Sequence, residues 1–380
     1  MKFCPKCGYF VNRKKHCTMC GYNSVNSISS KISSSKRGII VFMIAIVVIV
    51  ITTSLSIDNP NDSQLINSDI DYEIPSNLDT TLNPNNPLIQ FALDQVNDDR
   101  KKHGVPPVIL GNNSAAQNHV DDLLEFNYFS HWNSKGVKPY VTYTLFGGRG
   151  NIAENISYTF SQCPTSNCIP LVFDPLKEIE KHQYGMMYDD AHSNWGHRDT
   201  IIDPNHTHVN FGMASDGGNF YFAQHFETNI IEWTKIELVN GKLEMAGRLP
   251  DGFSVAQIEI YADESPKTLS GQTLDDESPY NQNYYDRGEL VGIFLEPLPI
   301  NTSYDECDVE KITVTDESGI KNCIDYKIFY NNRVHPDEIN TSIDVSEWLE
   351  SNGLHTVYVV LNNANNERVD ATSITLEYLE

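Results

Sequence analysis

Basic residues are scarce in this sequence beyond its first segment. The 380-residue chain has 27 Lys or Arg against 51 Asp or Glu, which gives a net charge of −24 at pH 7. Eight of the basic residues lie in residues 1–37, which contain no acid, so the remainder has 19 basic and 51 acidic side chains. Phosphate contacts need clustered Lys and Arg, so the acidic body is a poor candidate for nucleic-acid binding. A basic head on an acidic body suggests that the two parts face different compartments.

The sequence also lacks the compact motifs of several hydrolase classes. It has no His-Glu-x-x-His motif, which would place two zinc ligands and a general base on one helix. No Ser or Cys stands in a nucleophile elbow. Any catalysis would therefore depend on residues that the fold brings together from distant parts of the chain.

Charge is absent from residues 38–57, and residues 39–51 form an unbroken apolar run. Twenty residues at about 1.5 Å each can cross a hydrocarbon core of about 30 Å, so we predict a transmembrane helix over 38–57. Lys31, Lys36 and Arg37 precede it, which predicts a cytoplasmic N-terminus and C-terminal domains outside the cell membrane. A cleaved signal peptide is the alternative, but a long cysteine-containing segment precedes the apolar run, unlike a normal signal peptide.

The eight cysteines fall into two groups with different spacing. Two Cys-x-x-Cys pairs, each followed by Gly, lie at Cys4, Cys7, Cys17 and Cys20. Four thiolates in this spacing can bind one tetrahedral Zn²⁺, and metal binding would supply the folding energy of so short a segment. We therefore predict a zinc-ribbon over residues 1–24, similar to those at the N-termini of many prokaryotic membrane proteins, and a basic linker over 25–37. Its cytoplasmic partner is unknown.

The other four cysteines are predicted to form disulfides, Cys163 with Cys168 and Cys307 with Cys323. Disulfides persist in oxidising surroundings, whereas zinc thiolates are typical of reducing ones. A membrane between the two groups resolves this conflict. It also places the acidic body on the extracytoplasmic side.

The region after the apolar run is predicted to contain a flexible stalk and two domains. Residues 58–86 are rich in Asn, Asp, Pro and Ser, the composition of a stalk. In residues 87–228 the pattern predicts helices over 87–104 and 114–127, a third helix beginning at Asp174 and Pro175, and strands at 211–214 and 220–223. Residues 229–380 alternate short apolar runs with turn-forming residues, at 257–261, 290–295, 311–314, 356–361 and 373–379. That pattern predicts an all-β sandwich.

Six short segments between residues 97 and 226 resemble, in the same order, the motifs of the CAP superfamily (SCP/TAPS), prokaryotic type. These segments are Asn97-Asp98-Asp99-Arg100, Phe129-Ser130-His131, Ala153-Glu154-Asn155-Ile156, Met187-Tyr188-Asp189-Asp190, Gly196-His197-Arg198 and Phe222-Ala223-Gln224-His225-Phe226. The resemblance implies an α-β-α sandwich in which two His and two acids line one cleft. Two residues depart from the usual pattern, since Ala153 replaces Gly and Asp190 replaces Glu.

Carried over residue by residue, the resemblance implies a cleft formed by His131, Glu154, Asp190 and His197. Asp189 is an alternative for the second acid. Neutral imidazoles can bind a divalent metal, while the carboxylates orient the rings or act as a general base. A His–Glu pair can equally be a structural hydrogen bond. His119 and His225 have no special spacing and are interpreted as ordinary core or surface residues.

Three functions follow from these observations. The favoured one is a non-enzymatic binding module whose cleft takes a divalent metal and, as the resemblance implies, a lipid or peptide. The first alternative is a metal-dependent hydrolase or peptidase that uses the same four residues as catalytic groups. The second alternative is a cell-surface adhesion or envelope protein that acts through residues 229–380.

Overall fold

The computed structural model describes residues 86–160, 173–216, 218–276, 287–315, 319–349 and 353–377. All of them belong to one compact unit, Glu73–Glu380. The predicted zinc-ribbon, basic linker and transmembrane helix lie outside the described residues, as do the stalk up to residue 85 and the predicted Cys163–Cys168 bridge. Within the described ranges, no helix combines the length and the apolar character needed to cross a bilayer.

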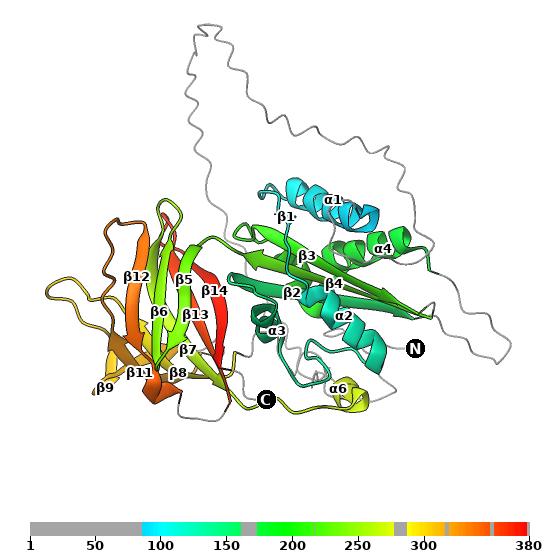
Figure 1. Ribbon diagram of the computed structural model, residues 1–380. Coiled ribbons are helices and arrows are strands. Elements are labelled where there is room, and N and C mark those ends of the chain that lie inside the picture. The colour runs from blue at the N-terminus through cyan, green and yellow to red at the C-terminus, as the bar shows by residue number, and fades with distance from the viewer. Residues whose placement is uncertain are drawn as a thin grey trace, which may run out of the picture. The chain divides into compact units, whose positions relative to one another are not determined.

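Residues 86–228, called the first module below, combine helices with a mainly antiparallel sheet (Figure 1). Its helical elements are α1 (Pro87–Lys102), α2 (Ala115–Phe126), α3 (Pro139–Leu145), α4 (Pro175–Tyr188), the 3-10 turn η1 (Ala191–Ser193) and α5 (Gly196–Ile201). Its strands are β1 (Ile109–Leu110), β2 (Asn151–Phe160), β3 (His208–Ser215) and β4 (Asn219–Thr228). Both predicted strands and the three predicted helices are confirmed, whereas α3 and α5 were not expected.

Local chemistry explains where the predicted helices begin and end. At the start of α1, the Asn86 side chain accepts a hydrogen bond from the Leu88 backbone N–H at 3.0 Å, which satisfies one of the donors left over in the first turn. Gly104 follows the helix with a φ of +73°, a conformation that costs Gly little. The second helix, α2, ends in the same way at Asn127, whose φ is +50°.

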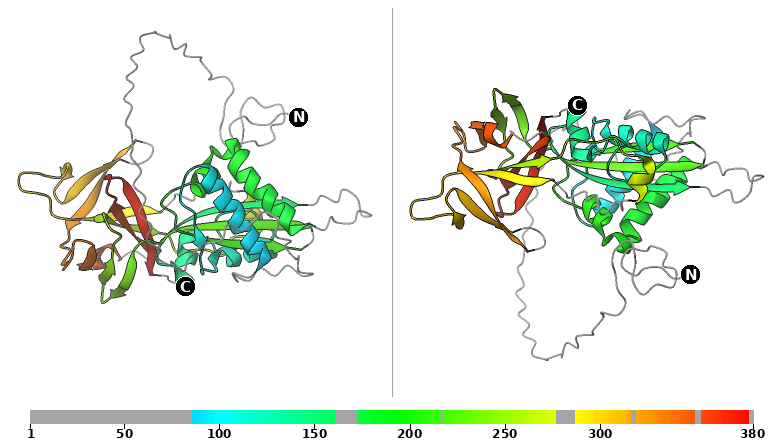
Figure 2. Two further views of the ribbon diagram at one scale, coloured as in Figure 1. Left: turned by 90° about the horizontal axis from the view of Figure 1, so that it is seen from above. Right: turned by 90° about the horizontal axis from the view of Figure 1, so that it is seen from below.

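The sheet of the first module is a central layer with the strand order β1-β3-β4-β2. Helices α1 and α4 cover one face and α2 covers the other, as the two views in Figure 2 show. Phe220 and Phe222 pack into the core beneath α1 and α4, while Tyr221 and Ala223 pack beneath α2. This alternation is what successive residues of a strand require. The expected α-β-α sandwich is confirmed.

Residues 229–377, called the second module, are rich in β-structure. The strands are β5 (Glu232–Val239), β6 (Lys242–Arg248), β7 (Ser254–Asp263), β8 (Glu289–Leu295), β9 (Glu306–Asp308), β10 (Lys311–Thr315), β11 (Lys321–Ile328), β12 (Glu338–Asp344), β13 (Leu354–Asn362) and β14 (Arg368–Glu377). They form a seven-stranded sheet, β14-β13-β7-β8-β11-β10-β9, and a three-stranded sheet, β12-β6-β5. Side chains from both sheets share one apolar core.

This region is rich in sheet, as predicted, and two short helical elements lie between its strands. Between β7 and β8 the chain forms a short helix, α6 (Gly271–Asp276), and a 3-10 turn, η2 (Ser346–Trp348), precedes β13. Leu274 of α6 is fully buried in the core beneath α2 of the first module. The helix therefore serves the first module, although it belongs to the second in sequence.

Polar contacts join the two modules. The Lys138 ammonium forms a 2.8 Å ion pair with Asp263, and the Tyr140 hydroxyl donates to the same carboxylate at 2.5 Å. The Ser373 N–H in β14 donates to the Gly150 carbonyl at 3.0 Å, directly before β2 begins. Both members of the ion pair are mostly shielded from solvent, so removal of either one would leave a shielded charge without its partner.

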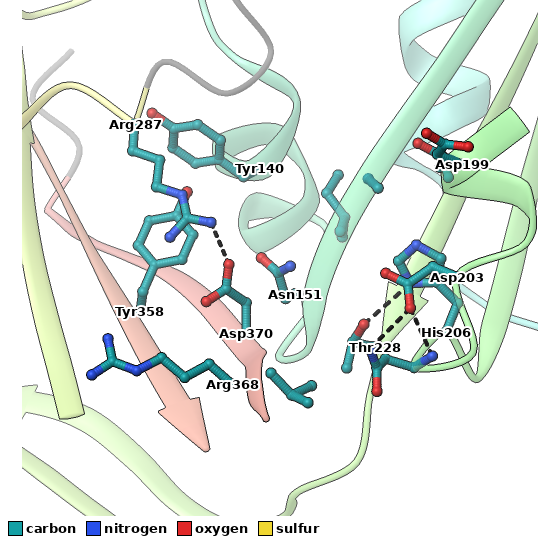
Figure 3. Close-up of a pocket in the computed structure, with 15 residues that line it drawn as sticks. Tyr140, Asn151, Asp199, Asp203, His206, Thr228, Arg287, Tyr358, Arg368 and Asp370 are labelled. Carbon is teal, nitrogen blue, oxygen red and sulfur yellow. Dashed lines mark hydrogen bonds and ion pairs between the residues drawn. The ribbon is translucent and has the colours of Figure 1, made fainter. Parts of the chain in front are cut away.

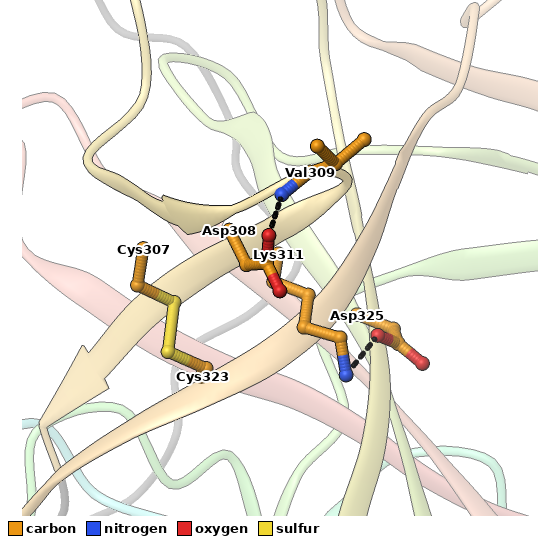
Figure 4. The surroundings of a disulfide bond; sticks show 6 residues. All are labelled: Cys307, Asp308, Val309, Lys311, Cys323 and Asp325. Carbon is orange, nitrogen blue, oxygen red and sulfur yellow. Dashed lines mark hydrogen bonds and ion pairs between the residues drawn. A yellow bond between two sulfur atoms is a disulfide. The ribbon is translucent and has the colours of Figure 1, made fainter.

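The predicted Cys307–Cys323 disulfide is present and ties β9 to β11 (Figure 4). The two cysteines are 16 residues apart, and closing a loop of that size stabilises a fold by roughly 3 kcal/mol. We expect Cys307→Ala combined with Cys323→Ala to lower the free energy of unfolding of the second module by about 2–4 kcal/mol. Urea unfolding monitored by circular dichroism measures this change. An equal unfolding midpoint for parent and double variant would contradict the stabilising role.

Candidate functional site

One buried carboxylate, Glu154 on β2, gathers three histidines. The Nδ1 atom of His119 lies 2.7 Å from Oε2, and the Nδ1 atom of His131 lies 2.7 Å from Oε1. The Nε2 atom of His225 lies 2.6 Å from Oε2, and His225 is the direct partner of Glu154 across the β2–β4 pairing. An ionised carboxylate can only accept hydrogen bonds, so each ring donates an N–H to it.

This cluster keeps Glu154 ionised despite its complete burial. Burial by itself raises the pKa of Glu154, but the charge of His119 and the hydrogen bonds from all three rings lower it well below its ordinary value. Burial likewise lowers the pKa of His119, and the charge of Glu154 with its hydrogen bond outweighs burial, so the pKa of His119 is raised. The pair His119–Glu154 is therefore a buried ion pair that holds the carboxylate in place for His131.

The interpretation of His119 and His225 as ordinary residues is wrong. His119 lies on the inner face of α2 with Ala115, Ala116 and Val120, and all four are buried. A histidine in an otherwise apolar helix face needs a buried polar partner. The place of His119 among these apolar residues could therefore have indicated such a partner from the sequence. His225 is buried as well, but its contact with Glu154 follows from strand register, which no local spacing reveals.

A second His–acid pair is formed by His197 and Asp190. The Nδ1 atom of His197 lies 2.7 Å from Oδ1 of Asp190, and the His197 backbone N–H donates to Oδ2 at 3.0 Å. Burial raises the pKa of Asp190, yet the hydrogen bond from His197 and its charge lower it overall. Asp189 is exposed, so Asp190, and not its neighbour, orients His197.

His131 and His197 line one pocket of about 610 Å³ in the first module. His131 enters it from the segment after α2, and Asp190 and His197 enter it from the end of α4 and the start of α5. Glu154 lies behind His131 with a fully buried side chain. The remaining lining is mixed and includes Phe129, residues 156–160, Lys181, His182, Tyr184, Gly185, Met186, Asp189 and His192. The structure thus brings the four predicted site residues together, with the acids supporting the two rings.

The first module matches a known protein family. Residues 93–226 match the family model described as CAP, the cysteine-rich secretory protein family. The chain contains a CAP domain. All six motif segments that suggested the resemblance begin and end within or at the border of this match.

Two solved structures resemble part of the chain. An extracellular protein containing an SCP domain from Bacillus anthracis is 20% identical, with 37% of this chain and 40% of that chain covered and a TM-score of 0.28. The CAP domain of enterococcal PrgA is 12% identical, with 37% and 59% covered and a TM-score of 0.24. A search of curated proteins gave no match. The assignment of the CAP domain rests on the family match.

The first motif of the CAP domain, Asn97 to Arg100, is structural. The Asn97 side-chain amide exchanges two hydrogen bonds of 2.9 Å with the backbone of Val108. The fully buried Arg100 guanidinium donates to the carbonyls of Pro106, Ile201, Asp203 and His206 at 2.6–3.3 Å. These contacts tie α1 to the segments around β1 and α5, and so they position the helix that carries His197.

Each of the two pocket histidines of the CAP domain has the support that a metal-coordinating imidazole needs. Each ring uses Nδ1 toward a buried carboxylate, so Nε2 is the nitrogen that would coordinate an ion. A carboxylate behind a coordinating imidazole fixes the ring and increases its basicity. Two imidazoles leave the other positions of a zinc or similar ion to water or a ligand.

A second group in the CAP domain has the composition of a metal site. Ligand atoms of His119, Glu154 and His225 lie within 4.8 Å of one another, and all three residues are buried. The nitrogens nearest to Glu154 are, however, at hydrogen-bonding distance from a single carboxylate oxygen. We interpret this group as the hydrogen-bonded support of His131.

Another pocket, of about 480 Å³, lies where the CAP domain meets the second module (Figure 3). Asp199 and Asp203 lie on its CAP side, and Arg287 and Arg368 lie on the other. Arg287 is paired with Asp370 and lies 4.2 Å from the centre of the Tyr358 ring. None of the four predicted cleft residues lines this pocket.

Proposed function

We propose that the CAP domain is an extracytoplasmic binding module whose pocket holds a divalent metal ion through Nε2 of His131 and His197. The observation that carries this proposal is the paired arrangement of each ring with its own buried carboxylate, Glu154 or Asp190, in one pocket. A bound ion would supply a Lewis-acidic centre with open positions for a ligand atom. The protein supplies the fixed ring orientations and a pocket wall rich in aromatic side chains.

One hydroxyl–imidazole pair in the pocket is poorly suited to hydrolysis. The two atoms of this pair, Ser157 Oγ and His182 Nδ1, are separated by 2.5 Å. Burial lowers the pKa of His182 to about 4, and a ring with this pKa is a weak general base at neutral pH. His182 is stacked on Phe220 and Phe222, which suits a structural role. The hydrolase alternative therefore gains no base from this pair.

A zinc titration by calorimetry tests the metal proposal. The protein is the full-length chain with Cys4, Cys7, Cys17 and Cys20 replaced by Ser, which removes the predicted N-terminal site. We expect one zinc ion to bind at pH 7.5 and the affinity to fall in acidic solution, because protons compete for imidazole nitrogen. Absence of zinc binding at pH 7.5 would overturn the proposal.

We further propose that the chain is anchored by residues 38–57 with its N-terminus in the cytoplasm. The apolar run, its basic N-terminal flank and the extracytoplasmic disulfide chemistry support this topology. We expect a membrane-impermeant maleimide to label Cys4, Cys7, Cys17 and Cys20 only after the cells are permeabilised and zinc is removed. A cysteine introduced at the exposed Glu237 is the matched control and should be labelled on intact cells. Labelling of the N-terminal cysteines on intact cells would contradict this orientation.

A further inference from the structure

Five consecutive residues of β2, 156–160, line the pocket that holds His131 and His197. Successive side chains of a strand point to opposite faces of its sheet. A pocket over one face would therefore be lined by every second residue. Because all five residues contribute, the pocket runs along the edge of β2 and reaches its backbone.

β2 is an edge strand of the four-stranded sheet (Figure 1). Each of its residues from Asn151 to Phe160 is paired with β4 on one side. Across the ranges that the structure describes, no strand pairs with its other side, and no backbone hydrogen bond ties residues 156–160 to a segment other than β4. An edge of this kind offers a row of backbone donors and acceptors to an added strand.

The walls of the pocket complete a groove along this edge. Phe129 and His131 form one wall, and Lys181, Tyr184 and Gly185 of α4 contribute to the other. Five strand residues span about 17 Å, the length of a short extended peptide. Tyr158, Phe160 and Tyr184 are 42%, 49% and 61% exposed, so the groove presents aromatic surfaces on both sides of the strand.

The charges in the groove differ between its two ends. Lys181 donates to the Thr159 hydroxyl at 2.9 Å and forms a 3.2 Å ion pair with Glu178, so the cation at this end of β2 is shared with a carboxylate of α4. At the other end, the Asn155 side chain donates to the His197 carbonyl at 3.1 Å, next to Asp190. A carboxylate at one end of a peptide would compete with Glu178 for the exposed Lys181, and apolar side chains along its length match the aromatic walls.

We propose that an extended peptide binds this groove as an additional strand of the CAP sheet, paired with β2. The inference rests on the pocket of the proposed function, but it does not require a metal ion. Main-chain hydrogen bonds to residues 156–160 supply the affinity, and the aromatic walls accept alternate side chains of the peptide. A lipid chain, by contrast, would use the apolar walls and leave the edge backbone without partners.

Gly185 allows a direct test because a Cβ atom at this position meets no other atom within 4 Å. Gly185→Leu therefore adds bulk to the groove wall without an internal clash, and it replaces a residue with low helix propensity. Glu180→Leu is the matched control, since Glu180 is exposed on the same helix and does not line the groove. Both variants are made in the full-length chain.

The probe is a library of fluorescein-labelled hexapeptides with Val, Ile, Phe or Tyr at alternate positions, Thr between them and a free C-terminal carboxylate. We expect binding by fluorescence anisotropy, weakened about tenfold or more by Gly185→Leu and unchanged by Glu180→Leu. N-methylation of the best peptide should weaken binding at every second residue, because only alternate N–H groups face a neighbouring strand.

Four outcomes decide the inference. Tolerance of N-methylation at every position, or equal binding by the Gly185→Leu variant, would overturn strand addition in this groove. Failure of the whole library to bind would overturn it as well. If the protein bound only phosphatidylcholine vesicles, and Gly185→Leu blocked that binding, the groove would be assigned to lipid. Zinc calorimetry on the same proteins separates the two proposals, because loss of zinc binding with retained peptide binding contradicts only the proposed metal site.

Discussion

Replacing His131 and His197 together with Ala is expected to remove measurable zinc binding from the chain whose four N-terminal cysteines are changed to Ser. Each single substitution should weaken binding by more than about 100-fold. The reason is that loss of a supporting group alone costs about 10–100-fold, and these rings would be the coordinating groups themselves. Calorimetry at pH 7.5 measures the dissociation constants of parent and variants.

His192 supplies the matched control for this experiment. It lines the same pocket and is exposed, but no carboxylate is within the hydrogen-bonding distance seen for His131 and His197 in the described part of the chain. We expect His192→Ala to leave the zinc affinity unchanged. If His119→Ala abolished zinc binding while His197→Ala had no effect, the ion would belong to the buried group of His119, Glu154 and His225.

Replacing Glu154 with Ala is expected to lower the free energy of unfolding by about 3–5 kcal/mol, the cost of removing one partner of a buried ion pair. Three buried or half-buried rings lose their acceptor in this variant. The measurement is urea unfolding of the cysteine-to-serine chain in EDTA, so that no metal contributes. Glu237→Ala removes an exposed carboxylate that pairs with Lys235 and should change the value by less than about 1 kcal/mol.

The difference in stability between the parent and the Glu154→Ala variant should depend on pH. Because the pKa of Glu154 is lowered on folding, its contribution is present above about pH 4.3, the ordinary Glu value, and is lost as the pH falls through the lowered pKa. Because the pKa of His119 is raised, its contribution is present below about pH 6.5 and is lost as the pH rises through the raised pKa.

Both contributions are present together between about pH 4.3 and 6.5. We therefore expect the difference between parent and variant to be largest near pH 5.5 and smaller at pH 8.5. A difference that stays constant from pH 5.5 to 8.5 would contradict the His119–Glu154 ion pair. A variant as stable as the parent at every pH would show that the carboxylate has no structural role.

Much of the first module could be predicted because its signals are local. Pro87 and Pro175 at helix starts, Gly104 and Asn127 after helix ends, and alternation along β4 all act within a few residues. The pair Asp190–His197 also lies only seven residues apart. The sequence indicated these two residues through the family resemblance and left Asp189 open as the second acid.

The hydrogen bonds from His119 and His225 to Glu154 could not be predicted in the same way. His119 and His225 are 35 and 71 residues away from it in sequence, so their contacts depend on helix packing and strand register. Helix α5 has six residues and follows Trp195, whose φ is +66°, a conformation that a bulky side chain rarely adopts. The open edge of β2 is likewise a property of strand order, which the order of segments along the chain does not reveal.

The contacts between the modules bear on how this protein can be divided. A cut after Thr228 falls between β4 and β5, where the sequence suggests a natural boundary. It would nevertheless remove Asp263 from the shielded Lys138, the Ser373 N–H from the Gly150 carbonyl, and Leu274 from the core beneath α2. The strand that carries Glu154 begins one residue after Gly150. The CAP domain of this chain therefore depends on contacts from the second module. Those contacts support the segment that leads into β2 and the core beneath α2.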